Sequence, residues 1–226
     1  LDKLNEASAP FDAGAEDARA TMEQASSTEE KAQLRLERYE EADGLNALMA
    51  TWVDDLSFVL DSITMPSGQD PKLQAISDRI DADQIGLVGM SFGGGAVTEL
   101  CKSDARCRAG LNIDGGTFGR RQREPLQVPF LGMQRENEDF LGYLMSASRT
   151  DYYAVEVKGA THLDFTDDTV VLPILKWMDI TGDIDGSRVI EITNAVSLRF
   201  FDAYLRGGPR PRFDDGFPEL SVRTND

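Results

Sequence analysis

Short apolar runs and helical repeats of apolar residues divide the chain into alternating elements. The apolar runs predict buried β-strands over residues 85–88, 109–113, 128–133 and 152–157. Apolar residues at helical spacing predict helices over residues 46–62, 73–80, 96–100, 139–146, 169–178 and 190–205. Since strands alternate with helices, the pattern predicts an α/β fold in which helices flank a parallel sheet.

The two ends of the chain show weaker patterns. Residues 1 to about 30 are polar, and we expect loop with short helical pieces there. Ser27, followed three residues later by a glutamate, is a capping-box signature for the start of a helix. We expect Gly44 to separate that helix from the next one, and Trp52 on the next helix to lie in the core. The proline-containing tail after residue 208 is expected to be irregular.

Composition restricts the function classes. The 226 residues suit one domain over residues 1–226, and a hydrophobic content of 41% is enough for a core. No stretch approaches a membrane span, and no signal peptide stands at the start. The chain starts without methionine, so we expect a mature or trimmed product. The net charge of −17 argues against nucleic acid and anionic membrane surfaces as partners.

A G-x-S-x-G motif, Gly89-Met90-Ser91-Phe92-Gly93, lies between a predicted strand and a predicted helix. This is the arrangement of the nucleophile elbow of α/β-hydrolases. The turn forces the serine into a strained backbone conformation, and glycines two positions away leave room for it. At the helix start, the Phe92 N–H is a candidate oxyanion donor. The alternative interpretation is an ordinary serine in a glycine-rich turn.

A serine nucleophile needs a base and an acid that orients the base. The only histidine, His162, follows the last predicted strand, where hydrolases of this fold place the base. Asp114, at the end of the strand after the elbow, is one candidate acid, although Asp-Gly pairs are also ordinary turns. The other candidates follow the next strand and are Glu136, Glu138 and Asp139. A solvent-exposed face would explain that group equally well.

Two further sets of residues are open to two interpretations. Cys101 and Cys107 flank a predicted turn, so a disulfide in an oxidising compartment and two reduced cysteines are both compatible with the sequence. Their spacing does not suggest a zinc site. Candidate substrate-binding residues lie beside the catalytic positions, and core packing would explain each of them as well; they are Met90, Phe118 and Phe165.

Four segments resemble the platelet-activating-factor acetylhydrolase family of α/β-hydrolases. They are residues 80–94, 108–114, 159–167 and 182–186, the last leading into a helix. In that family the acid follows the strand after the elbow, so the resemblance implies a triad of Ser91, Asp114 and His162. Met90 stands where the family usually has histidine, which affects the expected pocket wall and not the triad.

The family also has several strands before the elbow, and we recognise no clear strand among the 90 residues that precede Ser91. In the family, one of these strands carries the loop whose backbone N–H completes the oxyanion hole. We therefore expect the fold to lack its first strands and to expose a sheet edge, which is an aggregation hazard. A complementary N-terminal fragment or chain is the expected partner, and a homo-oligomer is the alternative.

The resulting hypothesis is a serine carboxylic-ester hydrolase that acts through an acyl-enzyme. The resemblance implies short acyl esters or phospholipid-like acetyl esters as substrates, and lipid degradation as the role, with no metal or organic cofactor. A polyester or lactone hydrolase, and a non-catalytic half that needs a partner chain, are the alternatives. The acidity and the candidate disulfide favour a secreted or periplasmic protein over a cytoplasmic one.

Overall fold

The computed structural model describes residues 2–65, 70–136, 142–172, 174–213 and 215–225. Its helices and strands follow the chain in the order α1 (Asp2–Ala13), α2 (Ala15–Gln24), α3 (Thr28–Glu40), α4 (Asp43–Thr64), α5 (Pro71–Ser77), β1 (Ile85–Met90), α6 (Phe92–Cys101), β2 (Cys107–Ile113), β3 (Phe130–Arg135), α7 (Gly142–Ala147), β4 (Tyr152–Val157), a short 3-10 helix η1 (His162–Phe165), α8 (Asp168–Val171), α9 (Ile174–Trp177), α10 (Gly186–Arg206) and β5 (Leu220–Thr224).

One five-stranded sheet forms the centre of the molecule, with the strands in the order β1-β2-β3-β4-β5. The first three pairings are parallel, as the alternation of strands and helices predicts, and β5 pairs antiparallel with β4. The expectation of an irregular tail was therefore wrong for β5. That short strand lies at the edge of the sheet and pairs only with β4. An edge strand tolerates nearby prolines, because only one of its sides has to form hydrogen bonds with another strand.

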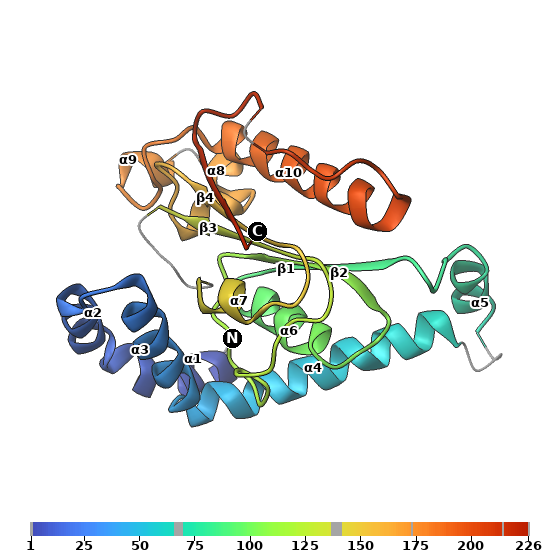
Figure 1. The fold of residues 1–226 in the computed structure, drawn as a ribbon, viewed down its shortest axis with the longest axis horizontal. Helices are drawn as coiled ribbons and strands as arrows, with labels where there is room; N and C mark the ends of the chain where they lie inside the picture. Colours follow the sequence, from blue (N-terminus) through green and yellow to red (C-terminus); the bar gives the residue numbers. More distant parts are fainter. Residues whose placement is uncertain (1, 66–69, 137–141, 173, 214, 226) are drawn as a thin grey trace.

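Helices cover both faces of the sheet, α4 and α6 on one and α10 on the other (Figure 1). Each layer has its own core, since one cluster of buried residues includes α6 and α4 and a second includes the inner face of α10. The carboxylate of Asp185 caps α10 by accepting from the backbone N–H of Arg188, and Gly207 ends the helix in the left-handed region at φ 68°.

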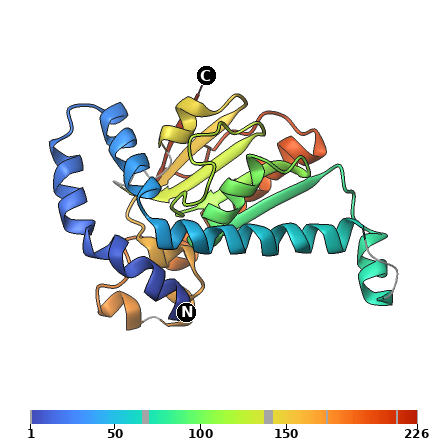
Figure 2. The same cartoon turned by 90° about the horizontal axis from the view of Figure 1, so that it is seen from below.

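The N-terminal segment is helical rather than loop. α1 and α2 fold back with α3 beside the N-terminal part of α4 (Figure 2). Leu4, Ala7 and Phe11 pack against the core, and this tertiary contact stabilises a polar segment that shows little helical pattern on its own. Ser27 caps α3 by accepting from the N–H of Glu30, as expected, whereas the break before α4 falls ahead of Gly44, which lies in its first turn.

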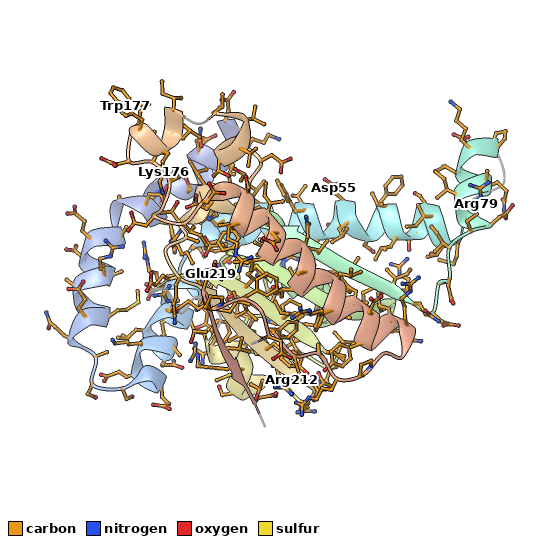
Figure 3. The ribbon with its side chains drawn as sticks, turned by 90° about the horizontal axis from the view of Figure 1, so that it is seen from above. Asp55, Arg79, Lys176, Trp177, Arg212 and Glu219 are labelled. Atoms are coloured by element: carbon orange, nitrogen blue, oxygen red, sulfur yellow. A yellow bond between two sulfur atoms is a disulfide. The ribbon has the colours of Figure 1, made fainter. Side chains whose placement is uncertain are left out.

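Trp52 is 41% exposed, so its expected place in the core was wrong. The indole packs edge-to-face on Phe92 at the start of α6, with ring centroids 5.1 Å apart. β1 is the last strand on its side of the sheet, and no other strand of the described chain pairs with its outer edge. The expected helix over residues 169–178 is divided into α8 and α9, and Trp177 on α9 projects away from the body of the molecule (Figure 3).

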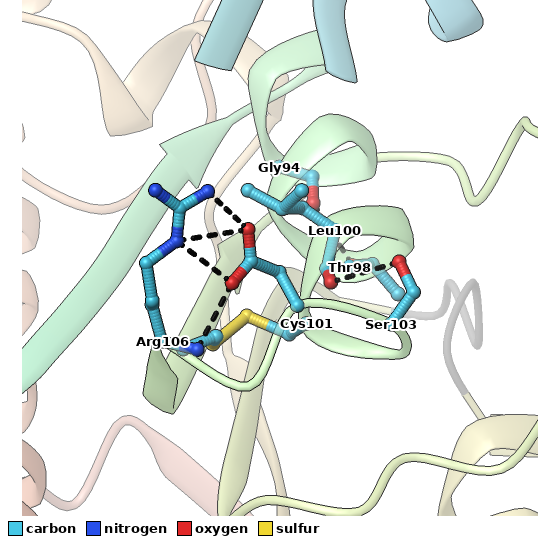
Figure 4. Close-up of a disulfide and its surroundings, with 8 residues drawn as sticks. Gly94, Thr98, Leu100, Cys101, Ser103 and Arg106 are labelled. Carbon is cyan, nitrogen blue, oxygen red and sulfur yellow. Dashed lines mark hydrogen bonds and ion pairs between the residues drawn. A yellow bond between two sulfur atoms is a disulfide. The ribbon is translucent and has the colours of Figure 1, made fainter. Parts of the chain in front are cut away.

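A disulfide closes the turn between α6 and β2. It joins Cys101, the last residue of α6, to Cys107, the first residue of β2, with Cα atoms 5.3 Å apart (Figure 4). In the same turn the guanidinium of Arg106 lies 2.7 Å from the carboxylate of Asp104. A disulfide and an ion pair therefore both stabilise the turn between α6 and β2. Within the described residues, none of the helices combines the length and apolar character needed to cross a membrane.

Candidate active site

Ser91 occupies a sharp turn between β1 and α6. Its backbone has φ 56° and ψ −128°, a conformation that is strained for any residue with a side chain. A Cβ atom on Gly89 would overlap the carbonyl of Gly93, so the turn can close only with glycine at that position. The N–H of Ser91 donates to the carbonyl of Ile113 at 2.8 Å, which fixes the turn against the end of β2.

Asn112 connects the elbow to the neighbouring loop. Its fully buried amide donates to the hydroxyl of Thr98 at 2.9 Å and to the carbonyl of Gly115 at 3.1 Å. Its oxygen accepts from the N–H of Gly115 at 2.9 Å. One side chain therefore ties α6 to the segment that follows Asp114. This role could not be predicted from the sequence, because an asparagine in an apolar strand shows no partner until the fold is known.

Asp114 lies at the carboxyl end of β2 in the left-handed region, with φ 49°. Aspartate tolerates this conformation better than most residues. Its side chain is fully buried, and Oδ1 accepts from the backbone N–H of Arg135 at 3.1 Å. The Arg135 guanidinium donates to Oδ2 at 3.2 Å. Arg135 thus holds the carboxylate and compensates its buried charge, a role that only its place at the end of β3 could have suggested.

A second aspartate, Asp164, holds the loop that carries His162. Its Oδ2 accepts from the backbone N–H and hydroxyl of Thr161, at 2.7 and 2.8 Å, and from the N–H of Gly182 at 2.7 Å. Thr161 and Asp164 together cap η1, the single 3-10 turn that begins at His162. The imidazole is therefore positioned by a cap on its own turn and by a bond to the segment before α10.

These elements bring Ser91, His162 and Asp114 into one hydrogen-bonded chain. Nε2 of His162 lies 3.0 Å from Oγ of Ser91, and Nδ1 lies 2.6 Å from Oδ2 of Asp114. The Asp114 carboxylate is inaccessible to solvent, whereas the His162 side chain is 36% exposed. This is the order of contacts that lets an imidazole take a proton from a serine while a carboxylate fixes its tautomer.

The backbone N–H of Phe92 belongs to the first residue of α6, where the amides have no acceptor within the helix. It follows the serine directly, in the position of an oxyanion donor at a nucleophile elbow. The partial positive charge of the helix N-terminus would favour an anion there.

The other candidate acids and pocket residues are placed differently. Glu136 accepts from the backbone N–H of Gly159 at 2.8 Å, and Glu138 and Asp139 lie outside the described residues. Phe118 lines a cavity beside His162. The remaining two candidates pack against the core under α10 and are Met90 and Phe165. In the described part of the chain, no group of three or more His, Cys, Asp and Glu side chains could hold a metal ion.

One protein family and several known proteins are similar to this chain. The family model described as platelet-activating factor acetylhydrolase, isoform II, matches residues 17–208. A platelet-activating factor acetylhydrolase of Gallus gallus is 28% identical over 140 residues, covering 58% of this chain and 33% of the relative. The enzyme of the same name from Canis lupus familiaris is 28% identical over 152 residues, covering 63% and 34%.

Among solved structures, a ferulic acid esterase from Streptomyces cinnamoneus superposes with a TM-score of 0.68 at 25% identity. The match covers 79% of this chain and 55% of that structure. The fold is therefore that of an α/β-hydrolase. This chain spans about a third of the length of the curated relatives that it matches. Because the family model covers most of the chain, the chain belongs to the platelet-activating factor acetylhydrolase, isoform II, family.

Proposed function

We propose that this chain carries the catalytic centre of a serine carboxylic-ester hydrolase. The observation that carries the proposal is the continuous hydrogen-bonded chain from Ser91 through His162 to Asp114. Membership of an acetylhydrolase family and the likeness to a ferulic acid esterase support the same reaction type.

In the proposed mechanism, Nε2 of His162 takes the proton of Ser91 as Oγ attacks the ester carbonyl. Asp114 keeps the proton of the imidazole on Nδ1 and stabilises the imidazolium that forms. The N–H of Phe92 stabilises the oxyanion of the tetrahedral intermediate. His162 then gives its proton to the leaving alcohol. Water, activated by the same imidazole, attacks the acyl-enzyme and releases the acid and Ser91.

Short acyl esters or phospholipid-like acetyl esters are the proposed substrates, and the names of the relatives support this choice. Polyesters and lactones are the alternative substrates. A panel of esters that differ only in acyl length, together with one polyester film and one lactone, distinguishes short acyl esters from polyesters and lactones as substrates. Faster turnover of acetyl than of longer acyl esters, with an inert polyester, supports the first class.

Hydrolysis of 4-nitrophenyl acetate tests the reaction itself. We expect Ser91→Ala to reduce the rate to background, and Ser103→Ala to leave it unchanged, because Ser103 lies in the turn after α6 on the opposite end of that helix from the elbow. Equal hydrolysis by the wild-type protein and Ser91→Ala would refute the assignment of the nucleophile.

We further propose that a complementary segment pairs with β1. Because β1 is an edge strand, its outer backbone groups face no other strand of the described chain. Val88 on β1 is 55% exposed, and Leu198 on α10 and Phe58 on α4 are exposed as well. The matched esterase has 55% of its chain covered, so a large part of that structure has no counterpart here.

This segment would supply strands beside β1 and the second oxyanion donor. Removing one such donor typically lowers turnover by about 10²–10³. The proposal predicts that active material contains a further polypeptide portion beyond the 24.9 kDa of this chain, whereas an active homo-oligomer of 24.9 kDa subunits would contradict it. A chain that remains unreactive without a complement would be a non-catalytic half.

A secreted or periplasmic location is the proposed one, and a cytoplasmic location the alternative. The disulfide between Cys101 and Cys107 supports an oxidising compartment. Mass analysis of alkylated protein from its native source shows whether the two cysteines are oxidised, because only reduced cysteines are alkylated. Two alkylated cysteines would favour the cytoplasm.

A further inference from the structure

A cavity of about 290 Å³ opens beside the imidazole of His162. It lies between α1–α3 and the carboxyl ends of β2 and β3, toward which the parallel strands point (Figure 1). Its size is at the lower end of small-molecule sites. A group bound there would lie beside the imidazole, whose Nε2 lies 3.0 Å from Oγ of Ser91.

Three arginines line this cavity, namely Arg35, Arg38 and Arg135. The chain as a whole carries 40 acidic and 23 basic residues, so a basic lining runs against its net charge of −17. Asp114 is the one carboxylate among the described lining residues, and it is buried in contact with His162 and Arg135. The lining side chains therefore carry more positive than negative charge, although the molecule as a whole is acidic.

Arg38 is held in place from one side. Its guanidinium stacks on the ring of Phe11, 3.9 Å from the centroid, and Nη2 donates to the carbonyl of Phe11 at 2.8 Å. Burial, and the nearby guanidinium of Arg35, lower the pKa of Arg38 from its ordinary value. An arginine has five N–H donors in a planar fork, and this one carbonyl bond leaves the fork able to bind an anion through two parallel hydrogen bonds.

The two other arginines add positive charge to the cavity, and each makes a contact of its own. Arg35 lies one helical turn before Arg38 on α3, and its Nη2 points to the sulfur of Met22 at 3.5 Å. Arg135 is engaged with Asp114. Aromatic side chains complete the wall, with Tyr39 and Phe118 packed edge-to-face at 4.9 Å. The lining thus combines cationic donors with apolar rings, which suits an anion attached to an apolar body.

We propose that this cavity binds an anionic group of the substrate, a carboxylate or a phosphate, through Arg38 with the support of Arg35. The assignment rests on the proposed esterase centre, since His162 and Asp114 of that centre line the cavity. Substrates would then be esters that carry a negative charge, and neutral esters of the same shape would be bound less well.

Calorimetric titration with three inert ligands tests this without requiring turnover. Benzoate and benzamide have nearly the same shape and differ in charge, and phenyl phosphate presents the second anion. Hydrogen bonds to charged groups contribute about 1.5–3 kcal/mol, so we expect an anion to bind about 10- to 100-fold more tightly than benzamide. Tighter binding of benzoate than of phenyl phosphate identifies the group as a carboxylate, and the reverse order as a phosphate.

Variants show which arginine is responsible for the tighter binding of anions. Arg38→Gln should remove the preference for the anion, and Arg38→Lys should retain part of it, because a lysine keeps the charge without the fork. Arg206→Gln removes the same charge from an exposed site at the end of α10 and should change nothing. Arg35→Gln, which does not alter the contact with Phe11, should weaken the preference even where Arg38→Gln fails to fold.

Equal affinity for benzoate, phenyl phosphate and benzamide would overturn the proposal, and so would an unchanged anion preference in both Arg38→Gln and Arg35→Gln. Failure of the esterase assignment is seen separately, as absence of ester hydrolysis by protein that still binds benzoate. Equally efficient hydrolysis of negatively charged and neutral esters of the same shape would refute the anion site alone.

Discussion

Replacement of Asp164 tests whether a single buried carboxylate holds the histidine loop. Asp164 is 1% exposed, and its Oδ2 accepts three hydrogen bonds from Thr161 and Gly182. Asp164→Ala would leave the N–H groups of Thr161 and Gly182 without this acceptor. A buried donor that loses its partner costs about 1–3 kcal/mol. Because the two N–H donors share one acceptor, their costs are not additive, and we expect a total loss of about 3 kcal/mol in the free energy of unfolding.

Asp164→Asn is the matched control. The amide oxygen can take the place of Oδ2 and keep all three bonds, while the amide NH2 takes the place of Oδ1, which has no partner among the described residues, and so adds a buried donor without an acceptor. We expect this variant to lose about 1 kcal/mol. Urea unfolding followed by tryptophan fluorescence measures both values, and the rate of ester hydrolysis reports whether the imidazole has moved. Two variants with equal stability, or an alanine variant within about 0.5 kcal/mol of the wild type, would refute the reasoning.

Three further perturbations have defined outcomes. Gly89→Ala should prevent a functional elbow, because its Cβ would overlap the carbonyl of Gly93; reactivity of the serine equal to that of the wild type would contradict this. Replacing Cys101 and Cys107 by alanine should lower the free energy of unfolding by about 2 kcal/mol, the loop-closure value for a short ring, as measured by urea unfolding. Burial lowers the pKa of Lys102 from 10.5 to about 8. The unfolded chain then binds more protons between pH 8 and 10.5, so stability should rise with pH across that window, by up to about 1.4 kcal/mol per unit, and Lys102→Met should flatten the rise.

The elements that carry their own local signal are those the sequence predicts. β1, the glycine-flanked turn and α6 are specified within 17 residues, from Ile85 to Cys101, so no distant contact is needed to recognise them. α1 and α2 are different, because their helical state depends on packing against α4. β5 likewise exists only because β4 presents an edge with which it can pair.

The candidate site divides in the same way. Residues at sequence positions fixed by the fold, such as Ser91 and His162, can be found from motif and order alone. Their supports, Asn112 and Asp164, act through partners that become neighbours only after folding. The arginines beside His162 come from α3 and β3, about a hundred residues apart, and no local pattern marks them as one group.

Labelling with a fluorophosphonate tests the central claim most directly, because the reagent modifies a serine only where a base and an oxyanion donor activate it. The account predicts one phosphonyl group on Ser91, found by mass spectrometry of peptides, with labelling abolished in Ser91→Ala and strongly slowed in His162→Gln. Labelling of the assembled protein at another serine, or at the same rate in His162→Gln, would contradict it.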